Sequence, residues 1–247
     1  MIKAENLGVK ANGKDIINGL TFAPKENRIH VIMGPNGSGK STLSRALAGH
    51  PNYEVTTGSV EMNGAEIKGL SPTEIAEKGL MLGFQHPPKV EGVGIKPFLR
   101  KILEARGRSS QEEIDEAIRK NGESVGLTEE QLNRNINEGF SGGERKRLEV
   151  LQGLLLNPEI LILDEPDSGV DVDSLKVIAK GIEDLDENGT TVVIITHYGN
   201  LLNYLDEDKI TVHLFQNGEI VTRGESSLVR EVEEKGFNQV FRECGCD

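Results

Sequence analysis

The chain has 247 residues, enough for one large α/β domain with a sizeable hydrophobic core. Its 40 acidic and 28 basic side chains give a formal charge of −12, which argues against a nucleic-acid binder and is otherwise ordinary for solubility. No apolar run approaches the ~18 residues of a membrane span, and residues 1–6 have no signal-peptide pattern. We therefore expect a soluble, cytoplasmic protein that does not insert into a membrane.

Both cysteines, Cys244 and Cys246, stand in the last four residues. Two cysteines cannot staple a fold of this size, so the chain is not a disulfide scaffold. A Cys-Gly-Cys sequence could bind a soft metal. The simpler interpretation is a tail with two inert thiols, and the sequence leaves both open.

Near the N-terminus the pattern predicts two antiparallel hairpins, with Asn12-Gly13 and Asn63-Gly64 as their turns. We expect these strands to flank the nucleotide site described next. The predicted strands are residues 2–10, 15–22, 58–62 and 65–67.

Residues 34–41 read G-x-x-x-x-G-K-[ST], the phosphate-binding P-loop. They follow an apolar run, 29–33, that predicts a buried strand, and they precede a helical pattern from Thr42, which is the context that the motif needs. The glycines allow backbone N–H groups to turn toward a phosphate, and the helix N-terminus adds partial positive charge. Lys40 is expected to reach the β- and γ-phosphates and Ser41 to hold Mg²⁺. The alternative is a glycine-rich turn without a ligand.

The next elements lead to a second motif residue. Ser71 and Glu74 form the pattern of a capping box and predict a short helix that ends near Gly79. The apolar residues 80–84 predict a buried strand, with Gln85 at its end.

The character of the chain then changes, and residues 87–157 show a helical pattern with no convincing strand. We interpret this stretch as a helical subdomain inserted into an α/β core. Its predicted helices are residues 96–107, residues 109–125 and a third that begins at Thr128.

The last third returns to strands that alternate with helices. Strand, helix and strand after the P-loop predict a mostly parallel sheet with helices on both faces. The predicted elements are strand 160–163, helix 173–187, strand 190–196, a hairpin of residues 210–216 and 219–222, and a helical segment 226–243.

Three further motifs could carry chemistry. Asp164 and Glu165 end an apolar strand, where a carboxylate can hold Mg²⁺ and its neighbour can activate a water for attack on the γ-phosphorus. Residues 141–144, Ser-Gly-Gly-Glu before a helical run, suggest a second phosphate-binding turn, with a glycine-rich N-cap as the alternative. His197 follows a strand and should face the ligand crevice, although a lone histidine is more often structural.

These motifs together resemble the ATP-binding cassette (ABC) ATPase family. Gly34–Ser41 matches its Walker A motif, Gln85 its Q-loop, Ser141–Glu144 its signature, Ile160–Glu165 its Walker B motif, Asp167–Asp171 its D-loop and His197 its switch histidine. The resemblance implies an α/β P-loop NTPase fold, with a RecA-like core, an antiparallel β subdomain and an inserted helical subdomain. It also implies ATP hydrolysis with Mg²⁺ in an ATP-dependent, head-to-tail homodimer, where each ATP lies between one subunit's Walker A motif and the other's signature.

The resemblance also assigns roles and boundaries. The core is expected in residues 1–86 and 158–225, the signature subdomain in 87–157, and a C-terminal helix and tail in 226–247. The expected catalytic residues are Lys40, Gln85, Glu165 and His197, and the expected Mg²⁺ ligands are Ser41, Gln85 and Asp164. The residues expected to bind nucleotide are Gly34, Pro35, Asn36, Gly37, Ser38, Gly39, Lys40, Ser41, Thr42, Ser141, Gly142, Gly143 and Glu144.

Finer details look like the SufC ATPases of the Suf iron–sulfur cluster assembly machinery. These details are Phe84-Gln85 followed by Gly92-Val93, and the acidic stretch 164–173. The resemblance implies docking on a SufB-like scaffold, alone or with a SufD-like one, through residues 85–100, and reshaping of that scaffold by ATP-driven dimerisation. The alternative is the nucleotide-binding subunit of an ABC membrane transporter.

Two observations bear on the remaining possibilities. A non-hydrolysing nucleotide switch is disfavoured because Glu165 and His197 are both present. Cassettes usually place an aromatic residue before the P-loop to stack on adenine, and residues 9–17 contain none, so we expect weak recognition of the base.

Overall fold

The structure, a computed structural model, describes residues 1–26 and 28–245. Its centre is a six-stranded sheet with the order β12-β11-β3-β10-β9-β6. The strands from β11 to β6 are parallel, and β12 pairs antiparallel with β11, which confirms the predicted mostly parallel sheet. The strands are β3 (Ile29–Met33), β6 (Leu80–Gly83), β9 (Ile160–Asp164), β10 (Thr191–Thr196), β11 (Ile210–Gln216) and β12 (Glu219–Gly224).

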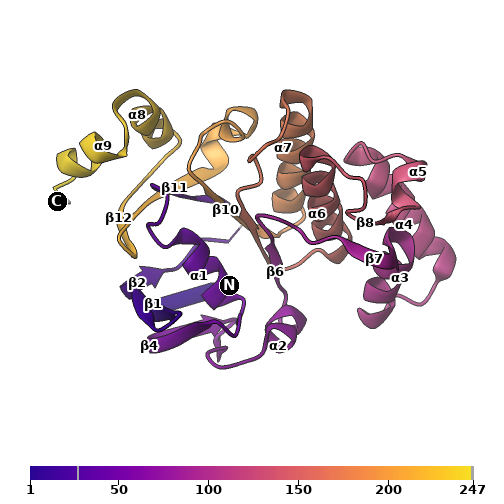
Figure 1. The fold of residues 1–247 in the computed structure, drawn as a ribbon, viewed down its shortest axis with the longest axis horizontal. Coiled ribbons are helices and arrows are strands. Elements are labelled where there is room, and N and C mark those ends of the chain that lie inside the picture. Colours follow the sequence, from indigo (N-terminus) through magenta and orange to yellow (C-terminus); the bar gives the residue numbers. More distant parts are fainter. Residues whose placement is uncertain (27, 246–247) are drawn as a thin grey trace.

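A second, antiparallel sheet has the order β2-β1-β4-β5 and confirms the two predicted hairpins. Its strands are β1 (Ile2–Ala11), β2 (Lys14–Phe22), β4 (Tyr53–Met62) and β5 (Ala65–Glu66). Figure 1 shows this sheet on the opposite side of α1 (Lys40–Leu47) from β10. The helix that follows the P-loop therefore lies between the antiparallel sheet and the central sheet.

The remaining helices flank the central sheet or lie beyond β6. Figure 1 shows α3 to α5 together at one end of the molecule, and the C-terminal pair α8 and α9 at the other. These helices are α2 (Pro72–Glu77), α3 (Ile95–Ala105), α4 (Gln111–Ser124), α5 (Glu129–Leu132), α6 (Gly142–Leu156), α7 (Val172–Glu187), α8 (Ser227–Lys235) and α9 (Phe237–Glu243), with short 3₁₀ turns η1 (Leu202–Tyr204) and η2 (Glu207–Lys209).

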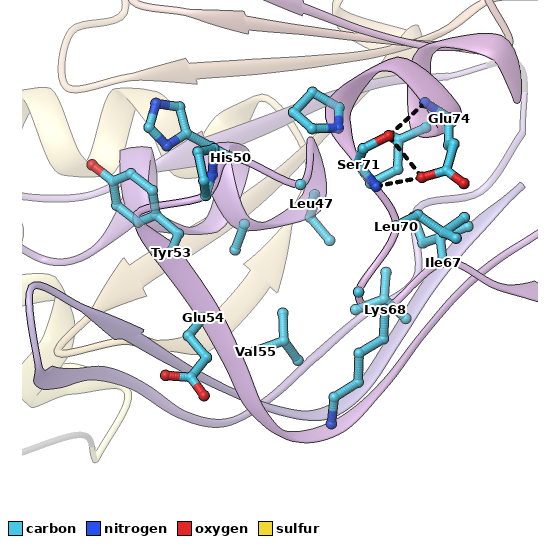
Figure 2. A pocket seen from close by; sticks show the side chains of 17 residues that line it. Leu47, His50, Tyr53, Glu54, Val55, Ile67, Lys68, Leu70, Ser71 and Glu74 are labelled. Atoms are coloured by element: carbon cyan, nitrogen blue, oxygen red, sulfur yellow. Dashed lines mark hydrogen bonds between the residues drawn. The ribbon is translucent and has the colours of Figure 1, made fainter.

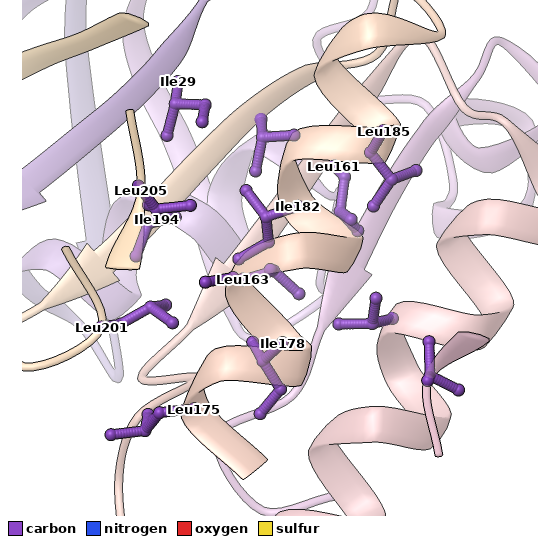
Figure 3. Packing of buried hydrophobic residues seen from close by; sticks show 14 of the residues in the cluster. Ile29, Leu161, Leu163, Leu175, Ile178, Ile182, Leu185, Ile194, Leu201 and Leu205 are labelled. Atoms are coloured by element: carbon purple, nitrogen blue, oxygen red, sulfur yellow. The ribbon is translucent and has the colours of Figure 1, made fainter. Parts of the chain in front are cut away.

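The central strands are buried along their whole length because helices or strands cover both faces of the sheet. Their side chains alternate between two apolar clusters. Leu161 and Leu163 point into the cluster that contains α7, whereas Ile160 and Ile162 point into the cluster that contains α1. Figure 3 shows Ile182 and its neighbours on α7 packed over the first cluster.

One prediction about local structure is wrong. Residues 87–157 do contain strands, because β7 (Val90–Gly94) pairs antiparallel with β8 (Asn135–Ile136). The segment 226–243 is helical as predicted, but it forms two helices, since Gly236 between them has a φ of 77°, which a continuous helix does not allow. The strand predicted at 58–62 begins earlier, at Tyr53.

The parallel register brings the motifs to one edge of the sheet. The register pairs Met33 with Thr196, and Gly83 with Leu163. The chain therefore leaves β3, β10, β9 and β6 at the same end of the sheet, and ligands of such sheets bind at the carboxyl ends of the strands. Each of these four ends is followed directly, or after one residue, by a predicted site residue.

Candidate functional site

The P-loop joins β3 to α1, so its backbone lies at the N-terminus of that helix, where N–H groups without helical partners can bind an anion. Gly37 and Gly39 have φ values of 79° and 108°, where a side chain would be strained. Gly34 is needed for space, because a Cβ there would lie 2.1 Å from the carbonyl oxygen of Phe215. The Oγ of Ser38 is buried with no hydrogen-bond partner among the described residues, which fits a hydroxyl placed to bond a phosphate.

Lys40 is folded against the P-loop. Its Nζ donates hydrogen bonds to the carbonyl oxygens of Gly34, at 2.7 Å, and Pro35, at 2.9 Å. Burial lowers the pKa of Lys40, and the carboxylates of Glu165 and Asp164 oppose that shift. A phosphate oxygen would give the ammonium a charged acceptor, and charge-assisted hydrogen bonds are the stronger kind.

Ser41 and Asp164 meet at the end of β9, where the Ser41 Oγ donates to the Asp164 Oδ1 over 3.2 Å. Burial raises the pKa of the Asp164 carboxyl, and the Ser41 hydrogen bond opposes this. A hydroxyl and a carboxylate are ligands that suit Mg²⁺, which completes its shell with water and phosphate oxygens. The pair therefore fits the predicted metal site.

The described part of the chain holds no group of three His, Cys, Asp or Glu side chains that could bind a metal ion. Cys244 is exposed, and Cys246 lies outside the described residues, so the prediction for the Cys-Gly-Cys tail is not tested.

Glu165 has a φ of 50°, which is uncommon for a non-glycine residue and typical of strained functional sites. Its N–H donates to the carbonyl oxygen of Ile195 over 2.8 Å, which ties the end of β9 to β10. Its Oε2 accepts a 2.6 Å hydrogen bond from the Gln85 Nε2. Its Oε1 lies 3.1 Å from the His197 Nδ1, within ion-pair distance but outside hydrogen-bond geometry. The structure thus places Gln85, Glu165 and His197 in one group.

These residues line a cavity of about 430 Å³ over the P-loop, a size typical of small-molecule sites. Its lining combines backbone N–H groups, one ammonium and one carboxylate, so the site suits a polyanion with a bound water. The lining residues are Ile16, Asn36, Gly37, Gly39, Lys40, Ser41, Thr42, Gln85, Glu165 and His197.

Ile16 is the lining residue that the sequence analysis missed. It lies on β2, and its Cγ2 would be 3.3 Å from a Cβ built on Gly39. The available signal was its apolar character within residues 9–17, where an aromatic residue is usual. The structure thus puts an aliphatic side chain at the entrance to the P-loop helix.

The predicted signature turn lies outside this cavity, since none of its four residues lines it. Ser141 is the N-cap of α6, and Glu144 closes a capping box by accepting from the Ser141 N–H over 2.7 Å. This hydrogen bond lowers the pKa of Glu144. A Cβ on Gly143 would lie 2.5 Å from the Ser174 Oγ. The N-cap alternative is therefore correct as local structure, and it leaves Ser141 exposed at a helix N-terminus.

A larger cavity, about 600 Å³, lies elsewhere on the molecule (Figure 2). Its walls come from α1, β4 and the segment before α2, with Leu47, Tyr53, Ile67 and Leu70 on its apolar side. The capping box of Ser71 borders it. None of the predicted site residues lines this cavity, so it is separate from the P-loop site.

No described helix is long and apolar enough to cross a membrane.

Comparison with known proteins identifies the architecture. Residues 17–168 match the family model described as ABC transporter. The chain is 41% identical over 243 residues to the probable ATP-dependent transporter SufC of Escherichia coli, covering 96% of this chain and 97% of that one.

Two further similarities are of the same kind. A probable ABC transporter ATP-binding protein of Streptococcus pyogenes is 40% identical over 252 residues, covering 100% of this chain and 97% of its own. The solved structure of an ATP-binding cassette of an ABC transporter in its ADP conformation superposes with a TM-score of 0.76 at 26% identity, covering 98% of both chains.

Proposed function

The chain belongs to the ABC transporter family of ATPases, and from this premise we propose that it is the motor subunit of an iron–sulfur cluster assembly machine. It dimerises head to tail on ATP and drives a conformational change in a SufB-like scaffold, alone or paired with a SufD-like one. The observation that carries the proposal is the 41% identity to the SufC relative over nearly the whole chain. We place this work in the cytoplasm, without nucleic acid.

Hydrolysis follows from the group around Glu165. The carboxylate accepts the proton of the attacking water as the water oxygen bonds to the γ-phosphorus, while the bond from that phosphorus to the β–γ bridging oxygen breaks and ADP leaves. Gln85 orients this carboxylate through the 2.6 Å hydrogen bond, and His197, on its other oxygen, contacts the γ-phosphate. Lys40 exchanges its two carbonyl acceptors for the β- and γ-phosphates and stabilises the charge that develops there.

Mg²⁺ would be held by the Ser41 hydroxyl, the Asp164 carboxylate and the Gln85 amide oxygen, and it would neutralise charge on the β- and γ-phosphates when bound. The Ser41–Asp164 hydrogen bond supports two of these ligands. The Gln85 Nε2 already donates to Glu165, which leaves the amide oxygen for the metal.

The head-to-tail dimer explains why one chain carries two phosphate-binding turns. Ser141, the first residue of the signature turn, is exposed, and the turn does not line the P-loop cavity. In the dimer, the Ser141 hydroxyl and the Gly143 N–H, at the N-terminus of α6, reach the γ-phosphate bound by the other copy.

The scaffold is expected to dock on the segment after β6. Phe84 is 52% exposed, and Val90 and Val93 are each 36% exposed, so apolar surface follows the Q-loop and continues along β7. The docking segment lies at the junction of the proposed core, 1–86 and 158–225, and the proposed signature subdomain, 87–157. A movement of the signature subdomain would therefore move the docking segment and the scaffold bound to it.

The runner-up is the nucleotide-binding subunit of an ABC transporter, which the printed name of the S. pyogenes relative supports. Hydrolysis would be the same, but the docking segment would meet a membrane permease. Co-purification with SufB-like and SufD-like proteins separates the two functions. We expect a stable complex that Phe84→Ser or Val90→Asp disrupts. Tyr204→Ser, which removes an exposed ring outside this segment, serves as the control. Capture of a polytopic permease with no scaffold binding would favour the runner-up.

A further inference from the structure

Lys146 and Glu149 form an ion pair inside the protein. They lie one turn apart on α6, their charged groups are 3.1 Å apart, and their side chains are only 5% and 7% exposed. Burial raises the pKa of Glu149, and Lys146 opposes that shift. Taking two charges out of water costs several kcal/mol per ion, so a buried pair by itself is weak evidence for stability. Its other contacts indicate what it does.

Both backbone polar groups of Phe84 are bonded to this pair. The Glu149 Oε1 accepts from the Phe84 N–H over 2.7 Å, and the Lys146 Nζ donates to the Phe84 carbonyl oxygen over 2.5 Å. The ladder between β6 and β9 stops one residue earlier, at Gly83. Side chains of α6 therefore continue the pairing that the sheet no longer provides.

Lys146 also holds the neighbouring strand, because its Nζ donates to the carbonyl oxygen of Asp164 over 3.3 Å. Phe84 directly precedes Gln85, and Asp164 directly precedes Glu165. One ammonium thus bridges the two backbones whose next residues form the 2.6 Å Gln85–Glu165 hydrogen bond. Figure 1 shows α6 passing beside β6.

We propose that Lys146 and Glu149 are positioning residues for ATP hydrolysis. They fix the separation of the two strand ends and thereby keep the Gln85 amide against the Glu165 carboxylate. Because α6 begins at the signature turn, the same contacts would transmit a movement of that turn to the Q-loop. This last step rests on the proposed dimer, whereas the positioning role does not.

The test removes both charges together in Lys146→Met/Glu149→Leu, which avoids leaving a single buried charge and is compatible with folding. We expect ATP affinity within about threefold of wild type and kcat lowered by about tenfold or more. Lys101→Met/Glu104→Gln, on an exposed pair of the same spacing, should retain wild-type kcat. A folded variant of the buried pair with kcat within about threefold of wild type overturns the proposal.

A double-mutant cycle separates positioning from a general structural role. In a Gln85→Ala background the loss caused by Lys146→Met/Glu149→Leu should nearly disappear, because both changes act on one hydrogen bond. Full additivity contradicts the proposal. If the double variant is insoluble, Glu149→Asp, which keeps the charge and shortens the reach to Phe84, is measured with the same threshold.

Failure of this inference and of the dimer can be told apart. ATP should make Glu165→Gln dimerise, and a chain that stays monomeric with ATP would overturn the proposed dimer. The kcat comparison for Lys146→Met/Glu149→Leu would still decide the positioning role.

Discussion

The Gln85 Nε2 donates a hydrogen bond to the Glu165 Oε2 over 2.6 Å and so joins the end of β6 to the end of β9. The two residues come from segments far apart in the sequence, and both line the cavity over the P-loop. Glu165 is also held at a φ of 50°. A strained carboxylate that is oriented from both sides is the group on which hydrolysis should depend most.

Glu165→Gln should lower the single-turnover rate of ATP hydrolysis by about 10²–10⁴-fold, because the amide cannot accept the proton of the attacking water. Nucleotide binding should persist, since Lys40 is held by the carbonyl oxygens of Gly34 and Pro35, which the substitution does not remove. Quench-flow with radiolabelled ATP gives the rate. Turnover at the wild-type rate would show that another group is the base.

Lys40→Ala should abolish the thermal stabilisation that ATP gives to the wild-type protein. Lys40 is the one lysine or arginine among the described residues that line the cavity, so its loss removes the main positive charge opposite the phosphates. Differential scanning fluorimetry with and without ATP measures this. An unchanged shift in melting temperature would contradict the assignment of the P-loop site.

Ile16→Tyr should tighten ATP binding by about 3–10-fold, because stacking of the tyrosine ring on adenine contributes roughly 0.5–1.5 kcal/mol to binding. Selectivity for ATP over GTP should rise with it, and Ile16→Ala should weaken binding. Fluorescence titration with both nucleotides gives the affinities. If neither substitution changes them, the base lies elsewhere.

A buried histidine pair should make the fold sensitive to acid. The His30 Nδ1 and His213 Nε2 lie 3.0 Å apart, and the His30 Nε2 donates to the Lys25 carbonyl oxygen. This leaves His30 Nδ1 as an acceptor from His213. Burial lowers the pKa of His30 to about 4 and of His213 to about 3.

The direction of this pH dependence follows from the link between proton binding and folding. The unfolded chain binds protons at these histidines below about pH 6.5 and the folded chain does not, so the free energy of unfolding falls as the pH drops from 6.5 toward 4. The slope is up to about 1.4 kcal/mol per histidine for each pH unit. Urea unfolding from pH 8 to 5 should show that the free energy of unfolding declines less steeply in His213→Leu than in wild type. In His86→Gln, which removes an exposed imidazole, the decline should equal that of wild type. An identical decline in wild type and His213→Leu would rule out the pair as the cause.

The sequence predicted the core of the fold because apolar strands that end in motif residues leave little freedom. Residues 29–33, 160–163 and 190–196 could only be strands of a covered sheet, and their common register brings Asp164 and His197 to one edge. The motif spacing likewise predicted most of the cavity lining.

What the sequence did not reveal depends on tertiary contacts. The strand β7 is largely exposed and contains two glycines, and β8 has only two residues, so neither has a local signal. Lys146 and Glu149 have the spacing of an ordinary exposed ion pair on a helix, and their burial becomes evident only when the backbone of Phe84 is placed between them. The subdomain boundaries and the roles of the signature residues remain predictions.

The central claim is that each ATP is hydrolysed between the P-loop of one copy and the signature turn of another. Complementation tests it most directly, using Lys40→Ala in one chain and Ser141→Arg, at an exposed position, in a second. Each variant alone should be inactive, and an equal mixture should recover about a quarter of the wild-type ATPase rate, because half of the dimers then carry one intact site. If the folded variants recover no activity when mixed, or if Ser141→Arg alone is fully active, the composite site is wrong.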